Sequence, residues 1–376
     1  MLQCSSANKG QTIARLLVGD KNLRRLYAII LACLGGFLCA YPVAVHGAAL
    51  PCENPVRWLF RPTETLCVEI LAEGWAVPGT VGAAALTFTP DGTLYFADSG
   101  GRRIARLISD QAGNFSPPET FLGDLPEMPY GLTYDGQRDR FYISGTRRIF
   151  AVSRTGVLTT LYESPSDGAG YGFGNVRIAP DGMLYVGMGV ACETCPPDEA
   201  GDRGALLRLD PDHRGAPEVI ARGLRHPFDL AWVGNSLYIA DDLPAGVPAA
   251  MYQITLSGTP PYPLGEPFIT LPPQSAPMGM MIYDGASFPA LQGRLMVALA
   301  GSWNAPEIAG YEIISLDLAT RRSERFLPVT GRTPSDAALI RTSFYPYRLT
   351  GLAIDGRGWL YIGVAQGKIY RIRFLG

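Results

Sequence analysis

The chain has 376 residues, of which 47% are hydrophobic and 18% charged, and its formal net charge is −2 at pH 7. This composition supplies enough apolar material for a large buried core and excludes intrinsic disorder. The sequence has no basic stripe, so we expect no nucleic-acid partner. With only 3 histidines, a multi-histidine metal site and an ordinary Ser-His-Asp hydrolase are both disfavoured. The 44 glycines and 31 prolines favour short strands joined by turns.

Residues 1–47 are predicted to be a targeting segment. Lys21, Arg24 and Arg25 precede an apolar run from Leu26 to Val45, which is the arrangement of a secretory signal. The run is about 20 residues long, so it could also remain as a single membrane anchor formed by residues 26–45. We therefore expect a signal peptide or a membrane anchor, followed by a periplasmic or secreted domain. Contact with a membrane is expected only through this segment, if it stays uncleaved.

Four cysteines follow the targeting segment: Cys52, Cys67, Cys192 and Cys195. An even number of cysteines in an exported chain suggests disulfides. The simplest pairing is Cys52–Cys67, which would tether the N-terminal arm, and Cys192–Cys195 within a loop. A redox or metal-binding CxxC is the alternative for the second pair. The sequence has no second CxxC for zinc and no thioredoxin-like pattern around this one, which favours a structural bridge.

One pattern recurs six times in the chain after the targeting segment. Each copy has a short apolar strand, a turn containing Asp-Gly or a similar pair, a strand that often begins Leu-Tyr, and a third strand. The copies are Ala83–Leu107, Pro129–Val152, Gly174–Leu209, Pro227–Ile254, Met278–Leu318 and Arg348–Phe374. Each unit holds about four strands, and radial repeats of four-stranded sheets form a propeller.

The sequence therefore predicts an all-β fold, a six-bladed β-propeller with four-stranded blades, in one domain spanning residues 48–376. Val68–Leu71 is expected to add a strand to the last blade, Tyr361–Phe374, and so close the ring. A pair of β-sandwiches is the alternative architecture. In a propeller, ligands usually bind at the mouth of the central channel, so functional residues are expected near the start of each repeat and in its longer loops.

Four motifs occur in a fixed order after residue 170. They are APDGMLYVGMG followed by the CxxC and GALLRLDPD, then Ala221–Pro227 (ARGLRHP), Ser275–Gly279 (SAPMG), and Gly301–Asn304 (GSWN) followed by Gly310-Tyr311. In this order they resemble the pyrroloquinoline-quinone (PQQ)-dependent sugar dehydrogenases of the glucose/sorbosone dehydrogenase family, over about residues 65–375. In that family the second motif reads A-x-G-L-R-N-P, with Asn where this chain has His226.

The resemblance implies an exported oxidoreductase that uses PQQ and calcium. Such an enzyme oxidises a sugar, polyol or related aldehyde by hydride transfer to the quinone and passes electrons to a separate acceptor. Backbone carbonyls hold the calcium in the family, and the matching positions here are Leu243 and Pro244. Arg225 and Arg348 match arginines that contact the cofactor, whose three carboxylates require cations. Asn175 replaces a further arginine and is also assigned to the cofactor.

The candidate catalytic base is Tyr171, which takes the place of the family's histidine. A tyrosine with its ordinary pKa near 10 is a poor base. His226, beside the cofactor arginine, and Asp167, in a Ser-Pro-Ser-Asp-Gly segment, are therefore further candidates. Ala300 and Ala305 stand where the sorbosone branch has a histidine and an arginine.

Two other functions remain open at this point. The substitutions at the expected catalytic positions would suit a degenerate propeller that binds a ligand or a protein partner without oxidation. A calcium-dependent hydrolase of the gluconolactonase type is the second alternative. It would hold one central calcium with side chains from different blades, and Asn175 and Asp229 could contribute, although the sequence shows no convincing glutamate partner.

Overall fold

The structure is a computed structural model that describes residues 51–52, 60–73, 82–213, 215–255, 264–302, 308–329 and 348–375. The predicted targeting segment, residues 1–47, and Ala305 lie outside these ranges. The described part of the chain contains no helix that is both long enough and apolar enough to span a membrane. All described residues belong to one compact unit, Leu50–Gly376.

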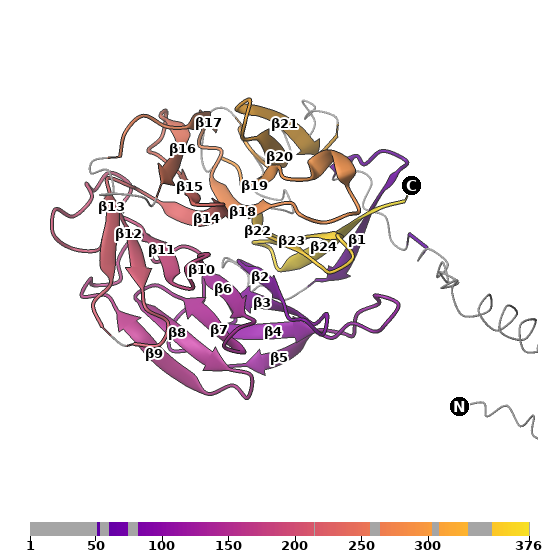
Figure 1. The fold of residues 1–376 in the computed structure, drawn as a ribbon, viewed down its shortest axis with the longest axis horizontal. Helices are drawn as coiled ribbons and strands as arrows, with labels where there is room; N and C mark the ends of the chain where they lie inside the picture. Colours follow the sequence, from indigo (N-terminus) through magenta and orange to yellow (C-terminus); the bar gives the residue numbers. More distant parts are fainter. Residues whose placement is uncertain are drawn as a thin grey trace, which may run out of the picture. The chain divides into compact units, whose positions relative to one another are not determined.

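The fold consists of six four-stranded antiparallel sheets arranged as blades around a centre (Figure 1). Blade one contains β2 (Leu86–Phe88), β3 (Leu94–Asp98), β4 (Arg103–Leu107) and β5 (Glu119–Leu122). Blade two contains β6 (Gly131–Asp135), β7 (Arg140–Ser144), β8 (Arg148–Ser153) and β9 (Leu158–Glu163). Blade three contains β10 (Arg177–Ile178), β11 (Leu184–Met188), β12 (Ala205–Leu209) and β13 (Glu218–Arg222).

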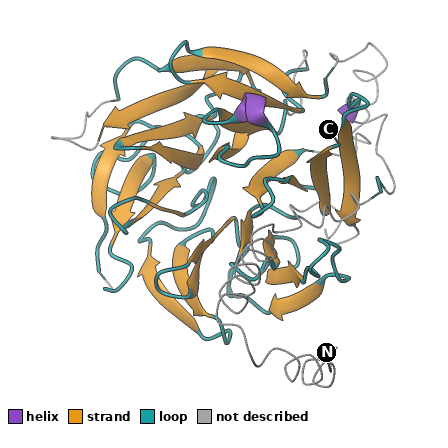
Figure 2. Ribbon diagram, turned by 45° about the vertical axis from the view of Figure 1, so that its right-hand side comes forward, coloured by secondary structure: helices purple, strands orange, loops and turns teal. Residues whose placement is uncertain are grey.

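The remaining blades follow the same order of strands. Blade four contains β14 (Pro227–Val233), β15 (Ser236–Asp241), β16 (Pro248–Thr255) and β17 (Ile269–Pro273). Blade five contains β18 (Pro277–Ile282), β19 (Leu295–Leu299), β20 (Glu312–Asp317) and β21 (Arg322–Leu327), with a short 3₁₀ helix, η1 (Pro289–Leu291), between β18 and β19 (Figure 2). Blade six contains β22 (Leu349–Ile354), β23 (Leu360–Val364), β24 (Lys368–Phe374) and β1 (Leu66–Ala72). The predicted all-β, six-bladed propeller is confirmed.

The ring is closed by strands from the two ends of the unit. β1 pairs antiparallel with β24, with Val68 opposite Ile372, so the strand predicted at Val68–Leu71 completes the last blade. A buried charge cluster reinforces this pairing, because Glu69 accepts hydrogen bonds of 2.8 and 2.9 Å from Arg371 and Arg373. The first strands of the blades lie around the centre, where β2 contacts β6 and β22, and β18 contacts β14 and β22.

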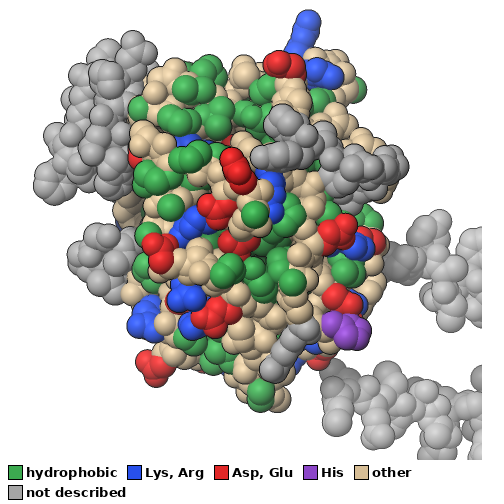
Figure 3. All heavy atoms as spheres, turned by 90° about the vertical axis from the view of Figure 1, so that its left-hand side faces the viewer, with side chains coloured by type: hydrophobic (Ala, Val, Ile, Leu, Met, Phe, Trp, Pro, Cys, Tyr) green, Lys and Arg blue, Asp and Glu red, His purple; other side chains and the backbone are tan. Residues whose placement is uncertain are grey.

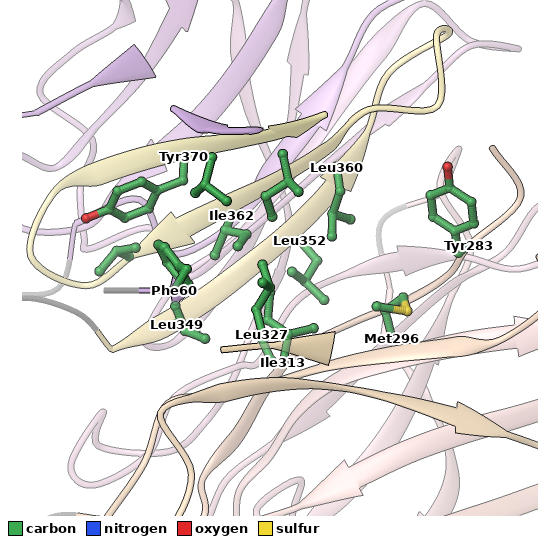
Figure 4. Close-up of a cluster of buried hydrophobic side chains, with 14 of the residues drawn as sticks. Phe60, Tyr283, Met296, Ile313, Leu327, Leu349, Leu352, Leu360, Ile362 and Tyr370 are labelled. Carbon is green, nitrogen blue, oxygen red and sulfur yellow. The ribbon is translucent and has the colours of Figure 1, made fainter. Parts of the chain in front are cut away.

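The core consists of six hydrophobic clusters, one between each pair of neighbouring blades. Figure 4 shows the cluster between blades five and six, where Ile313 and Leu327 face Leu352 and Ile362. Side chains alternate between the two faces of a strand, and both faces of a blade pack against neighbours. The second strand of a blade, such as β11 or β23, is therefore buried along its whole length. This explains the continuous apolar character of the Leu-Tyr runs.

The Asp-Gly pairs form the turns between the first two strands of blades one and three. Gly92 and Gly182 have φ values of 83° and 78°, which a residue with a side chain rarely adopts. The preceding aspartates accept backbone hydrogen bonds two residues on, from Thr93 to Asp91 at 3.1 Å and from Met183 to Asp181 at 2.9 Å. These local bonds fix the turn that the sequence indicates.

On the face shown in Figure 3, basic and acidic side chains are interspersed. Cross-strand ion pairs also occur between the outer strands of a blade. Arg208 on β12, for example, lies opposite Glu218 on β13, with 3.0 Å between Nη1 and Oε2. Such exposed pairs contribute little to stability, about 1 kcal/mol or less.

Candidate functional site

The candidate site lies on the loops before the first strand and after the second strand of blades three and four. In an antiparallel blade these two loops emerge at the same end, so segments far apart in the sequence meet there. The residues that meet are Tyr171, Glu193, Arg225, His226, Asp241 and Asp242, which we call the mouth cluster. Tyr171 precedes β10, Glu193 follows β11, Arg225 and His226 precede β14, and the two aspartates end and follow β15.

Asp241 holds the loop that carries Arg225 and His226. Its buried carboxylate accepts hydrogen bonds from the backbone N–H of Arg225 at 2.9 Å and of His226 at 2.6 Å. Burial raises the pKa of Asp241 to about 7, against the effect of these two donors, which favour the ionised form. The Asp241 carboxylate, at the end of β15, therefore fixes the backbone position from which the Arg225 side chain extends.

The guanidinium of Arg225 is the centre of the mouth cluster. Its Nε donates to the carbonyl of Glu193 at 3.1 Å, and its Nη1 donates to the carbonyl of Asp242 at 2.7 Å. Its Nη2 donates to the Tyr171 hydroxyl at 2.9 Å and lies 2.6 Å from Glu193 Oε2. Three loops are thus joined through one buried cation.

Tyr171 lies between Arg225 and His226. Its ring stacks on the imidazole of His226, with 4.1 Å between centroids and 22° between planes, and the Arg225 guanidinium carbon lies 5.0 Å from the ring centroid. The hydroxyl donates to Glu193 Oε2 at 2.6 Å. Burial, together with this hydrogen bond, raises the pKa of Tyr171 to about 12. The phenol therefore stays protonated at neutral pH and acts as a hydrogen-bond donor.

His226 is neutral at physiological pH. Burial lowers its pKa to about 3, and the positive charge of Arg225 acts in the same direction. A neutral imidazole keeps one ring nitrogen as a hydrogen-bond acceptor. The structure thus brings two of the three predicted catalytic candidates, Tyr171 and His226, into direct contact.

Asp167, the third candidate, lies one side chain away from the mouth cluster. Its exposed carboxylate accepts hydrogen bonds from the backbone N–H of Ala169 at 3.0 Å and from Arg203 Nη2 at 2.9 Å. These two bonds lower the pKa of Asp167, so the carboxylate is ionised. Arg203 also donates to the carbonyl of Tyr171 at 3.4 Å and so links Asp167 to the mouth cluster.

Two of the predicted cofactor residues, Arg348 and Asn175, are not members of the mouth cluster. Arg348 donates to the carbonyls of Gly301 at 2.8 Å and Ser302 at 3.0 Å, between blades five and six, and burial lowers its pKa. Asn175 is buried, and its Oδ1 accepts a 3.0 Å hydrogen bond from the backbone N–H of Leu132 on β6. That bond ties blade three to blade two.

The first strands of blades three, four and five are joined by an ion pair. Arg177 on β10 donates to both carboxylate oxygens of Asp229 on β14, at 2.8 and 2.6 Å, and to the carbonyl of Met280 on β18 at 3.0 Å. Asp229 also accepts from the backbone N–H of Met280 at 2.9 Å. A guanidinium therefore already neutralises the carboxylate that could have contributed to a central calcium.

The predicted calcium ligands, Leu243 and Pro244, directly follow Asp242. The carbonyl of Pro244 accepts a 3.0 Å hydrogen bond from Val247 within a turn. Among the described residues, Asp242 Oδ1 is buried and has no hydrogen-bond donor. Asp242 Oδ2 lies 3.7 Å from Arg225 Nη1. Burial raises the pKa of Asp242 to about 6, against the charge of Arg225 and a backbone hydrogen bond from Ala276, which both lower it.

Both predicted disulfides, Cys52–Cys67 and Cys192–Cys195, are present. Cys52, Cys67 and Glu69 bring possible metal ligands within 4.8 Å of one another. The two sulfurs are bonded to each other and Glu69 pairs with arginines, so this group is structural.

The sequence did not point to Glu193 as a contact of the mouth. Its one signal in the sequence is its place between the two cysteines of the CxxC, a motif that points to disulfide or metal chemistry of the sulfurs. Asp242 carried the signal of an acidic pair after a strand, which strand-end capping explains equally well.

The fold and the mouth cluster define a six-bladed propeller with a polar, charge-paired site on the loops of blades three and four. The chain belongs to the family described as SMP-30/Gluconolactonase/LRE-like region, whose model matches residues 81–322, well over half of its length. A second model, Strictosidine synthase-like, N-terminal, matches residues 351–372. No curated protein matches the chain.

Solved structures with the same fold include both dehydrogenases and a lactonase. A calcium structure of Carbohydrate-Active Enzymes Family AA12 from Trichoderma reesei has a TM-score of 0.67 at 12% identity, covering 86% of this chain and 99% of that one. The holo PQQ domain of pyranose dehydrogenase from Coprinopsis cinerea has a TM-score of 0.66 at 15% identity, with coverages of 86% and 99%. A gluconolactonase from Xanthomonas campestris has a TM-score of 0.57 at 16% identity, with coverages of 82% and 89%. At these identities the likeness shows the fold, and the narrower assignment to the PQQ dehydrogenases stays a prediction.

Proposed function

We propose that this chain is an exported enzyme that oxidises a sugar or a related alcohol or aldehyde with PQQ and calcium. The observation that carries the proposal is the buried oxygen Asp242 Oδ1, which has no hydrogen-bond donor among the described residues. The other oxygen, Oδ2, lies 3.7 Å from Arg225 Nη1, so the orphaned oxygen is Oδ1 alone. A buried carboxylate oxygen without a donor is costly, and a bound cation would remove that cost. This oxygen belongs to the residue next to Leu243 and Pro244, whose carbonyls are the predicted calcium ligands.

The residues of the site have the chemistry that calcium and PQQ require. Calcium prefers oxygen ligands, and Asp242, Leu243 and Pro244 would supply a carboxylate and two carbonyls. PQQ carries carboxylates, and Arg225 and Arg348 would bind them with their planar guanidinium groups. When bound, the quinone and calcium supply the hydride acceptor and the polarising charge.

The remaining residues of the mouth cluster would position the substrate. His226 keeps a neutral ring nitrogen that can accept a hydrogen bond from a substrate hydroxyl. Tyr171 stacks on that ring and holds its orientation. Similarity of fold to a PQQ-containing pyranose dehydrogenase domain supports the sugar as substrate class.

The test is a titration of PQQ into the purified protein with excess calcium, in which tryptophan fluorescence reports binding. Turnover is then measured as reduction of an artificial electron acceptor in the presence of aldoses and aldehydes. We expect saturable binding and dye reduction. Asp242→Asn should weaken calcium binding in calorimetry, whereas Asp284→Asn, at an exposed aspartate of blade five, should not. Absence of PQQ binding at saturating calcium would overturn the proposal.

Lactone hydrolysis is the second candidate, because the family model for the gluconolactonase-like region matches most of the propeller. The residues named for its central calcium do not fit that ion here. Both oxygens of Asp229 are held by Arg177, and Asn175 Oδ1 is held by Leu132. Hydrolysis of a sugar lactone in a pH-stat, without PQQ binding, would favour this candidate.

A further inference from the structure

The CxxC forms a small ring beside the mouth cluster. The disulfide between Cys192 and Cys195 closes a four-residue segment of the β11–β12 loop, and the N–H of Cys195 donates to the carbonyl of Cys192 at 3.2 Å. Glu193 lies within this ring. So short a covalent ring restricts the backbone of Glu193 but leaves its side chain free to rotate.

Glu193 places one oxygen on two donors of the mouth cluster. Its Oε2 lies 2.6 Å from the Tyr171 hydroxyl, which donates to it, and 2.6 Å from Arg225 Nη2. The two partners differ in their environment, because the Glu193 side chain is 58% exposed and that of Arg225 is 8% exposed. A surface carboxylate therefore satisfies a buried guanidinium and the hydroxyl of a partly buried tyrosine.

Because Glu193 is exposed and Arg225 is buried, a ligand arriving from solvent could replace Glu193 on Arg225 and Tyr171. If Glu193 turns outward, its carboxylate is hydrated at little cost. Arg225 would then lose a charged acceptor while its guanidinium stays buried, which is costly unless another acceptor takes that position. Tyr171 would lose the acceptor of its hydroxyl as well. A carboxylate brought by a ligand offers the same charge and the same oxygen geometry.

We propose that Glu193 is a displaceable internal carboxylate, and that a carboxylate-bearing ligand binds at the mouth by replacing it on Arg225 and Tyr171. The Cys192–Cys195 disulfide holds the backbone of Glu193 beside Arg225 and Tyr171. Reducing the disulfide should therefore weaken the competition by Glu193 and increase the affinity for the ligand. The carboxylate can come from PQQ or from a sugar acid. Only the PQQ source rests on the proposed function.

The test compares the wild-type chain with Glu193→Gln by calorimetry, using PQQ with calcium, gluconate as a sugar acid, and glucose as a neutral sugar. Glu193→Gln removes the competing charge at an exposed side chain, so the fold is retained. We expect it to bind at least one of the two carboxylate ligands about tenfold more tightly than the wild type, or better. Glucose binding should be unchanged. Glu199→Gln, an exposed glutamate of the same loop, is the matched control and should bind like the wild type.

Two further variants test the geometry. Tyr171→Phe combined with Glu193→Gln removes the second donor and should lose most of the gain. A Cys192→Ser, Cys195→Ser variant should bind the carboxylate ligand more tightly than the wild type. The same two serines should add nothing when Glu193 is already Gln, because the disulfide acts through that side chain.

The outcomes separate this inference from the proposed function. Tighter gluconate binding by Glu193→Gln with no PQQ binding supports the displaceable carboxylate and overturns the PQQ proposal. Tighter PQQ binding supports both. The inference is overturned if Glu193→Gln binds neither carboxylate ligand more tightly than the wild type and the Glu199→Gln control.

Discussion

The buried ion pair between Arg177 and Asp229, on the first strands of blades three and four, should contribute measurably to the free energy of unfolding. Asp229 is 2% exposed and Arg177 is 20% exposed. Removing one partner of a buried pair typically costs about 3–5 kcal/mol, since the other charge stays buried without compensation. Because Arg177 is partly hydrated, we expect Arg177→Ala to lose about 3 kcal/mol, at the lower end of that range.

A second substitution separates the charge effect from lost packing. Arg177→Ala with Asp229→Asn removes the buried charge as well, while an amide oxygen can still accept from the backbone N–H of Met280. We expect the double variant to recover about 1–3 kcal/mol relative to Arg177→Ala. Added calcium should stabilise Arg177→Ala more than the wild type, because the bare Asp229 carboxylate would then attract a cation.

Urea denaturation followed by tryptophan fluorescence measures all these free energies of unfolding. Arg208→Ala is a suitable control, since its pairs with Glu218 and Asp181 both involve exposed carboxylates and should change stability by about 1 kcal/mol or less each. A free energy of unfolding for Arg177→Ala within about 1 kcal/mol of that of the control would contradict this expectation. A double variant no more stable than Arg177→Ala would also contradict it.

Three further predictions concern the frame around the site. Asn175→Ala should lower the free energy of unfolding by about 1–3 kcal/mol in urea, because the buried N–H of Leu132 loses its acceptor. Burial alone would raise the pKa of Glu69, but hydrogen bonds and charge from two arginines outweigh burial and lower it below 4.5. Its stabilisation is therefore present above pH 4.5 and is lost as pH falls through the folded pKa. Glu69→Gln should thus be less stable than the wild type at pH 6, with the gap narrowing under acid conditions; a constant gap would contradict this. Replacing Cys52 and Cys67 by serine should cost about 3 kcal/mol for the loop that their disulfide closes, again measured in urea against the wild type.

The fold was largely predictable because its signals are local and repeated. Asp91-Gly92 and Asp181-Gly182 specify turns within a few residues, and both have the positive φ that the turn requires. Copies of one hairpin pattern can bury their apolar faces only against one another, so the number of repeats sets the number of blades. The closing strand was predictable because the last repeat supplies three of the four strands of its blade.

The site was predictable in part. The motif order located Arg225 and His226 before β14, and Tyr171 before β10. Asn175 shows the limit of such reasoning. Its polar side chain was assigned to the cofactor, which stays a prediction, and the contact that its Oδ1 makes with Leu132 of the neighbouring blade was not foreseen. A polar residue next to an inner strand can contact a ligand, a neighbouring blade or both, and only the position of the adjacent blade shows the contact between blades.

The sequence by itself determined the blade number, the closing strand and both disulfides, since each follows from spacing, turn chemistry or cysteine count. The tertiary structure alone decided which charges meet. Arg225 reaches Tyr171, 54 residues away, and Glu193, 32 residues away. Contacts of this kind depend on how the loops of adjacent blades converge at one end of the ring. Loop convergence is set by blade packing rather than by any local pattern of residues.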